Sequence, residues 1–152
     1  MSRVAGLIAL FALATPQVAL AEGCPATADG VRSLLQGRKV LRTQAQGGFA
    51  QDGFTDYEGS GLVFGVQPLG YELQTKSDQV RELRIYLPGT SIQPYSHSMR
   101  NAHSGATCES DSCEWRESEA ALGALESVTM METIYRRDAM TLWCRYANSA
   151  GW

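Results

Sequence analysis

The sequence predicts a single α+β domain in which five to six short antiparallel strands form a meander, with one N-terminal helix and one shorter helix packed on one face. Three observations predict this fold. Several segments alternate apolar and polar residues, as strands with one buried face do. Two segments show the spacing of amphipathic helices. Four cysteines behind an export signal indicate two disulfides.

A signal peptide is predicted at residues 1–21. Arg3 precedes an apolar run that ends at Ala14, and Ala19-Leu20-Ala21 has the small residues of a cleavage site. The apolar run is too short for a transmembrane helix. We therefore expect residues 22–152 to form one periplasmic or secreted domain, without membrane insertion after the signal is removed.

The first elements of the mature chain follow from helix and turn signals. A helix is predicted over Pro25–Gln36, because proline stands in its first turn, Asp29 lies near its positive end and Gly37 suits a left-handed cap. A strand follows at 38–44. The glycine-rich stretch at 45–61 reads as a long loop.

A central hairpin is the clearest strand signal. After a short strand at Leu62–Val66, apolar residues alternate with polar ones over 69–74 and again over 83–87, on either side of a turn at Lys76-Ser77-Asp78. One face of this hairpin is expected to contact water. Pro88-Gly89 ends it.

The second half of the chain is less regular. Residues 90–105 are polar and read as an irregular segment. A short helix is predicted at Glu119–Glu126, and a second hairpin at Val128–Tyr135 and Met140–Tyr146, with a turn at 136–138.

The four cysteines allow three disulfide pairings. We favour Cys108 with Cys113, since four intervening residues close a small loop, and Cys24 with Cys144, which joins the first element to the last. No C-x-x-C motif is present, which argues against a redox or zinc site.

Composition and motifs exclude several function classes. Without Arg3 the mature chain has 12 basic and 16 acidic side chains and a net charge of −4, so nucleic acid is not an expected partner. Neither G-x-S-x-G nor H-E-x-x-H occurs. No catalytic residue and no cofactor is therefore assigned.

Two groups of residues offer metal ligands without completing a site. His97, Met99 and His103 carry donors that copper accepts, but no carboxylate or cysteine is spaced to join them. No metal site is predicted. Asp52, Asp56 and Glu58 in the glycine-rich loop carry oxygen ligands that calcium accepts. Their spacing is not that of an EF-hand.

The loop between Cys108 and Cys113 is the strongest candidate for recognition. A bridge would rigidify a short acidic protrusion, with Glu109, Asp111 and the nearby Trp115 as binding residues, and a rigid loop loses less entropy on binding. The alternative is a purely structural bridge in a surface loop.

This C-x4-C loop resembles the one by which the family of inhibitors of vertebrate lysozyme enters its target. That family's loop carries a basic residue, proline and histidine, where this chain has Glu-Ser-Asp-Ser at 109–112. Cys24-Pro25 and the Trp143-Cys144-Arg145-Tyr146 segment are also similar to those of small periplasmic disulfide-stapled proteins of unknown function. This second resemblance implies a periplasmic location and a small disulfide-bonded fold.

These observations favour an exported binding protein, an inhibitor or recognition module that acts through the 108–113 loop on a secreted or envelope protein. Two alternatives stay open: a small periplasmic hydrolase with a site near His97 and His103, and a structural component of the envelope. The sequence leaves the oligomeric state undetermined.

Overall fold

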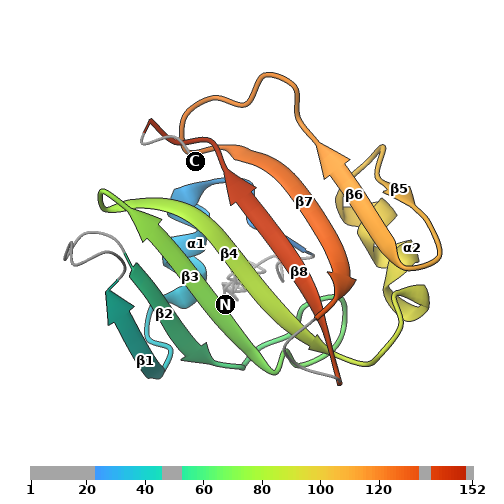
Figure 1. Cartoon of the computed structure of the whole chain (residues 1–152), viewed down its shortest axis with the longest axis horizontal. Coiled ribbons are helices and arrows are strands. Elements are labelled where there is room, and N and C mark those ends of the chain that lie inside the picture. The colour runs from blue at the N-terminus through green and yellow to red at the C-terminus, as the bar shows by residue number, and fades with distance from the viewer. Residues whose placement is uncertain (1–22, 46–52, 134–137, 150–152) are drawn as a thin grey trace, which may run out of the picture.

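The computed structural model describes residues 23–45, 53–133 and 138–149. Within them, eight antiparallel strands form one sheet, which two helices accompany (Figure 1). The predicted meander of five to six strands is therefore wrong in strand number and connectivity. The predicted signal peptide lies outside the described residues, as does most of the predicted turn at 136–138.

The chain is built from two successive units, each a helix followed by four strands. The first unit consists of α1 (Ala28–Leu35), β1 (Val40–Ala45), β2 (Gly53–Glu58), β3 (Gly70–Lys76) and β4 (Gln79–Pro88). The second unit consists of α2 (Gln93–Ala102), β5 (Thr107–Cys108), β6 (Ser112–Arg116), β7 (Leu125–Glu132) and β8 (Ala139–Tyr146). Each set of strands is a meander, and the two meanders join where β4 pairs with β8, which gives the order β1-β2-β3-β4-β8-β7-β6-β5.

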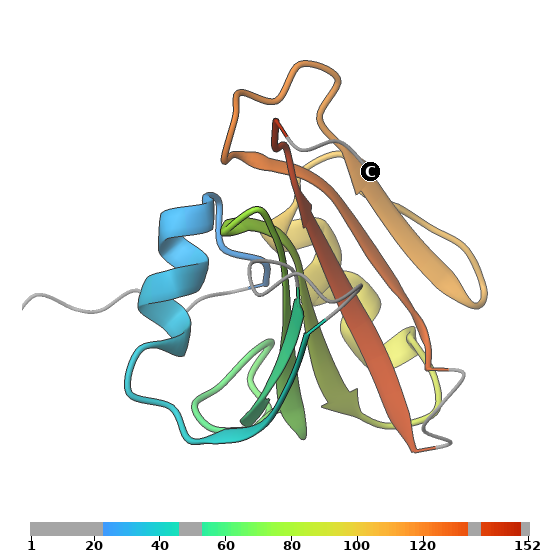
Figure 2. The same ribbon diagram turned by 60° about the vertical axis from the view of Figure 1, so that its left-hand side comes forward.

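One face of the sheet carries the hydrophobic core. At the β4–β8 junction the register pairs Leu83 with Cys144, Ile85 with Leu142 and Leu87 with Met140, and all six side chains are buried. Both helices lie behind the sheet in Figure 1, and the turned view in Figure 2 agrees. They cover this face with the apolar side chains Val31, Leu35, Tyr95 and Met99.

The predicted N-terminal helix is confirmed over a shorter range. It begins at Ala28 because the hydroxyl of Thr27 accepts a hydrogen bond from the backbone N–H of Gly30 at 3.1 Å and caps the first turn. The central hairpin is also confirmed. Ser77 and Asp78 form its turn with φ of 51° and 60°, values that match the right-handed twist of the flanking strands.

Two segments predicted as irregular are regular elements. Residues 53–58 of the predicted glycine-rich loop form β2, because β1 and β3 both pair with this segment. Residues 93–102 form α2, with a proline in its first turn and Tyr95 and Met99 buried one helical turn apart. In both cases tertiary contacts outweigh a weak local signal.

The helix predicted at Glu119–Glu126 is absent. Leu125 already belongs to β7, and the preceding residues form a turn in which the N–H of Ala124 donates to the carbonyl of Ala121. Gly123 has φ of +78° and donates to the carbonyl of Ala147, while Leu122 is 73% exposed. The segment thus joins the start of α1 to the end of β8 instead of packing as a helix.

The strand predicted at Leu62–Val66 is reduced to one pair of hydrogen bonds between Val63 and Val66, at 2.8 and 3.1 Å. This loop folds closely over the start of β3. A Cβ atom at Gly59 would lie 2.0 Å from the carbonyl oxygen of Pro68, so the close approach requires glycine there.

Both predicted disulfides are confirmed. Cys24 is bonded to Cys144, which fixes the segment before α1 to the central strand β8. Cys108 is bonded to Cys113 across the paired edge strands β5 and β6. No free cysteine remains among the described residues.

Candidate functional site

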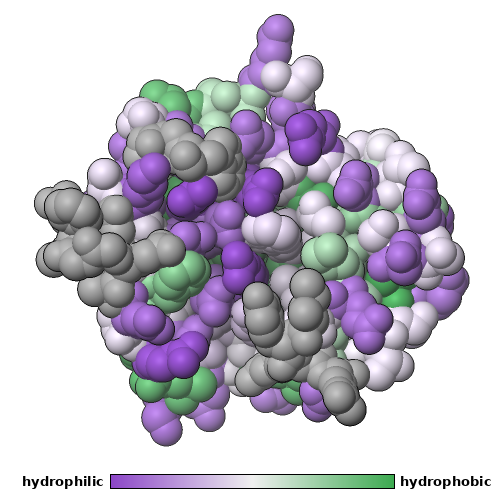
Figure 3. Space-filling view, viewed as in Figure 1, coloured by the Kyte–Doolittle hydropathy of each residue, from purple (hydrophilic) through white to green (hydrophobic). Residues whose placement is uncertain are grey.

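The face of the sheet opposite the helices, here called the open face, is the candidate functional surface. No helix of the described chain covers it, and hydrophilic residues predominate across it (Figure 3). The register aligns one residue from each strand in a row that crosses the whole sheet: Arg42, Asp56, Glu72, Arg84, Trp143, Thr129, Glu114 and Thr107. Side chains from strands far apart in sequence therefore meet on one surface.

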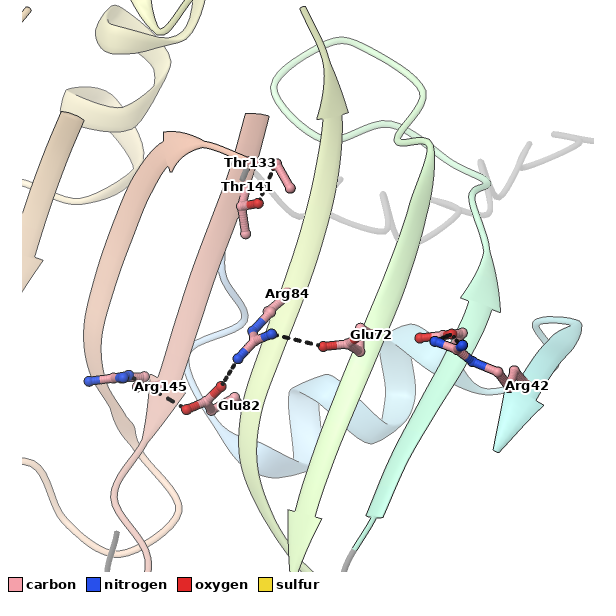
Figure 4. A network of polar contacts seen from close by, with 8 residues as sticks. Arg42, Glu72, Glu82, Arg84, Thr133, Thr141 and Arg145 are labelled. Atoms are coloured by element: carbon pink, nitrogen blue, oxygen red, sulfur yellow. Dashed lines mark hydrogen bonds and ion pairs between the residues drawn. The ribbon is translucent and has the colours of Figure 1, made fainter. Parts of the chain in front are cut away.

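Ion pairs connect the middle of this row. Arg84 bonds Glu72 on β3 at 3.1 Å and Glu82 on its own strand at 3.2 Å, and Glu82 in turn lies 3.7 Å from Arg145 on β8 (Figure 4). Glu82 is almost fully buried, and its carboxylate has lost contact with water. The two guanidinium groups offset the free-energy cost of this lost hydration. Arg84 therefore bonds one carboxylate on the neighbouring strand and one on its own.

The indole of Trp143 is in contact with the same two arginines. The guanidinium carbon of Arg145 is 4.1 Å from the ring centroid and that of Arg84 is 5.0 Å away. Each contact is a cation–π interaction of about 0.5–1 kcal/mol at a partly exposed site. The arrangement fixes an aromatic surface at the centre of the open face.

A groove runs across the strands beside this row. It consists of a cavity of about 400 Å³ over β1 to β4 and a second of about 230 Å³ over β4, β8 and β7. Both cavities are lined by Arg84, Tyr86 and Thr133, so they adjoin at these residues. The hydroxyls of Thr133 and Thr141, which line the second cavity, are hydrogen-bonded to each other (Figure 4).

Burial changes the acidity of groups in the groove. The pKa of Glu72 is raised, first because the carboxyl is partly removed from water and then because Asp56 lies next to it, although Arg84 acts in the opposite direction. The pKa of Tyr86 is raised as well, mainly by burial. Arg42 pairs with Asp56 at 2.8 Å at the β1 end.

The predicted recognition loop borders the open face. Glu109 and Asp111 are exposed at the tip of the β5–β6 hairpin, which the disulfide closes. The next residue, Ser112, pairs in register with Met131, which lines the groove. The loop therefore begins where the groove ends.

Trp115 lies further along β6, on the side of the sheet that faces the helices. Its ring packs 5.5 Å from His103, and its indole N–H donates to the carbonyl of Ser104 at 3.2 Å. It is half-buried under the C-terminal end of α2. The structure therefore separates Trp115 from the loop tip with which the sequence grouped it.

The two histidines do not face one another. His97 is exposed on α2, where its Nε2 lies 3.0 Å from the amide of Asn101, whereas His103 is buried where that helix ends. Met99 is fully buried in the core. In the part of the chain that the structure describes, no cluster of three or more histidine, cysteine or acidic side chains could hold a metal ion.

His103 is expected to make the fold sensitive to acid. Burial lowers its pKa, and its Nε2 has no hydrogen-bond partner among the described residues. The unfolded chain, with a pKa near 6.5, then takes up the proton more readily than the native state, so stability falls as pH decreases through that range. We expect the urea midpoint to fall more between pH 7.5 and pH 5 for the wild type than for His103→Phe. Parallel losses in both proteins would show that His103 is not the cause.

Sequence reasoning missed the open face as a site. The alternation around Arg84 and Tyr86 did predict a water-exposed face of the hairpin, but Asp56 lay in a segment read as a loop. Trp143 was noted only as part of a motif. The alternating polar residues of β4 and β8, taken together with their pairing, are the signal that identifies the surface.

No protein-family model, curated protein or solved structure matches this chain. Among the described residues, no helix is long and apolar enough to cross a membrane.

Proposed function

We propose that this protein is an exported, non-catalytic binding protein that receives the basic surface of a partner protein on its open face, with the 108–113 loop at the border of the interface. The observation that supports this most is the sheet itself: two helices cover one face, and the other is a grooved surface of paired side chains over which no described helix lies. Surfaces organised in this way lose little entropy when a partner binds.

Binding fits the polar groups of the face better than catalysis does. Arg84, Glu72 and Glu82 neutralise one another in fixed ion pairs, so they are positioned as a surface and are not poised for proton transfer. A hydrolase with a site near His97 and His103 would need one of these histidines beside a nucleophile, whereas His97 contacts Asn101 and His103 packs against Trp115.

The charge distribution indicates the kind of partner. Glu109, Asp111 and Glu114 are exposed around the loop and form no ion pair with any described residue, while Arg116 lies at the other end of β6. Uncompensated carboxylates attract a positively charged surface and speed its association. Two disulfides are consistent with an oxidising compartment, where such a partner would be secreted or part of the envelope.

A charge reversal at the loop tests this function. We expect a displayed library of random twelve-residue peptides to enrich lysine- and arginine-containing sequences on the wild type, and Glu109→Lys/Asp111→Lys to lower their affinity at least tenfold by repulsion. Affinities are measured by fluorescence anisotropy.

The matched control is Glu117→Lys/Glu119→Lys, which makes the same charge change at exposed residues after β6. It should bind the selected peptides nearly as the wild type does. Absence of any enrichment, or equal binding by both double variants, would overturn the proposed function.

A further inference from the structure

A further cavity of the open face lies over β5, β6 and β7, at the edge of the sheet opposite β1 (Figure 1). Its volume is about 400 Å³. Two register pairings place its polar side chains on the open face: Thr107, Glu114 and Thr129 belong to the row that crosses the sheet, and Arg116 pairs with Ser127 two residues further along. The lining therefore includes five polar side chains from three adjacent strands.

These side chains differ from those of the groove because none of them has a partner within the described chain. In the groove, Arg84 is bonded to Glu72 and Glu82. In this cavity, by contrast, the carboxylate of Glu114 and the guanidinium of Arg116 form no ion pair with a described residue, although they lie on the same side of β6. The three hydroxyl groups form no hydrogen bond to a described residue either.

Ser127 is the most informative of the five. It is only 9% exposed, and a hydroxyl group that is buried to this extent usually has a hydrogen-bond partner. Because Ser127 lines the cavity, a molecule bound there can provide that partner. The buried hydroxyl therefore indicates a ligand that carries polar groups.

The mixture of polar groups indicates the kind of ligand. Glu114 only accepts hydrogen bonds, Arg116 only donates them, and a hydroxyl group does both. An anion would leave Glu114 without a partner, and a cation would leave Arg116 without one. Neighbouring hydroxyl groups of one neutral molecule can donate to both oxygens of a carboxylate and accept from the N–H groups of a guanidinium.

We infer that this cavity binds one or two units of a neutral saccharide. The volume supports this size, because small-molecule sites span about 300–1,000 Å³ and this one is near the lower limit. The inference goes beyond the proposed function and does not depend on it. The proposed function concerns a protein partner, whereas this cavity receives a small ligand with several hydroxyl groups.

The test follows the backbone amide signals of the folded protein by NMR. The probes are maltose, cellobiose and N,N′-diacetylchitobiose, each compared with its tetrasaccharide, which distinguishes a free sugar from a longer chain as the source. We expect saturable shifts of the amides of Thr107, Ser127 and Thr129 with at least one of these saccharides. Glycine, which carries an ammonium and a carboxylate group, should cause no saturable shift.

Two variants test the assigned contacts. Ser127→Ala should weaken saccharide binding about fivefold, and Glu114→Gln about tenfold, because hydrogen bonds to a charged group are the stronger ones. The hydroxyl of Ser127 has no partner in the free protein, so Ser127→Ala should keep the urea midpoint of the wild type. Thr129→Val provides another cavity variant if Ser127→Ala does not fold.

The matched controls are Ser118→Ala and Glu117→Gln, which make the same chemical changes at exposed residues outside the cavity. They should bind the saccharide as the wild type does. The inference is overturned if no neutral saccharide shifts the cavity amides, if glycine alone does so, or if the cavity variants bind as tightly as the controls.

The inference and the proposed function can fail separately. If library peptides bind in a manner that depends on Glu109 and Asp111 but no saccharide shifts a cavity amide, the inference is wrong and the proposed function stands. If a saccharide binds in the cavity but no basic peptide is enriched, the inference stands and the proposed function is wrong.

Discussion

Removal of the Cys24–Cys144 disulfide is expected to destabilise the protein by about 5 kcal/mol. The bond closes a loop with a sequence separation of 120 residues, and in the chain-entropy model its loss allows the unfolded chain many more conformations. The variant is Cys24→Ala/Cys144→Ala. Urea denaturation of the variant and the wild type, followed by circular dichroism, gives the difference in free energy of unfolding.

The second disulfide provides the matched comparison. Cys108 and Cys113 are only five residues apart, so the same model gives a loss of about 2 kcal/mol for Cys108→Ala/Cys113→Ala. We therefore predict that removing the Cys24–Cys144 bond lowers the free energy of unfolding more than removing the Cys108–Cys113 bond does. A loss for the short loop as large as that for the long one would contradict an origin in loop length.

A cavity at the junction of the two meanders is expected to have an effect of comparable size. Leu142 is fully buried and pairs in register with Ile85, where β8 meets β4. Leu142→Ala should lower the free energy of unfolding by about 2–5 kcal/mol, because neighbouring side chains fill the lost volume only in part. Urea midpoints provide the measurement.

Leu122→Ala is the control for this experiment, since it removes the same atoms from a side chain that is 73% exposed. Its effect should stay within about 0.5 kcal/mol. A Leu142→Ala variant that is as stable as Leu122→Ala would show that the β4–β8 junction does not hold the two units together.

The parts of the fold that the sequence predicted correctly are those with strong local signals. Apolar and polar residues alternate across β3 and β4 around a turn at Ser77-Asp78, and that hairpin is present. The disulfide pairing followed from loop size and chain order. The capped helix α1 also had a clear start and end.

The missed elements depend on tertiary contacts. β2 lies in a glycine-rich stretch and becomes a strand because neighbours on both sides pair with it. α2 is polar along most of its length, and only Tyr95 and Met99 contact the core. Conversely, the apolar residues near Leu122 suggested a helix, although that side chain faces water.

The candidate site shows the same division. The exposed acidic residues Glu109 and Asp111 could be recognised from the sequence because a disulfide encloses them. The groove could not, since its lining comes from six strands whose order in the sheet is set by the β4–β8 pairing. A local sequence pattern predicts which residues share one face of a hairpin. Which charged side chains meet on that face depends on the strands that pair with it.

The indole N–H signals of two tryptophans test the central claim most directly. Trp143 lies in the groove of the open face, while Trp115 packs against His103 on the side of the helices. Trp152, which lies outside the described residues, is replaced by phenylalanine so that two indole signals remain. A lysine- and arginine-containing peptide selected from the displayed library is titrated into this protein, with a counterpart that has glutamate at each basic position as the control. The account predicts that only the basic peptide moves the Trp143 signal and that Trp115 stays in place. A shift of Trp115 alone, or of neither signal, would contradict binding on the open face.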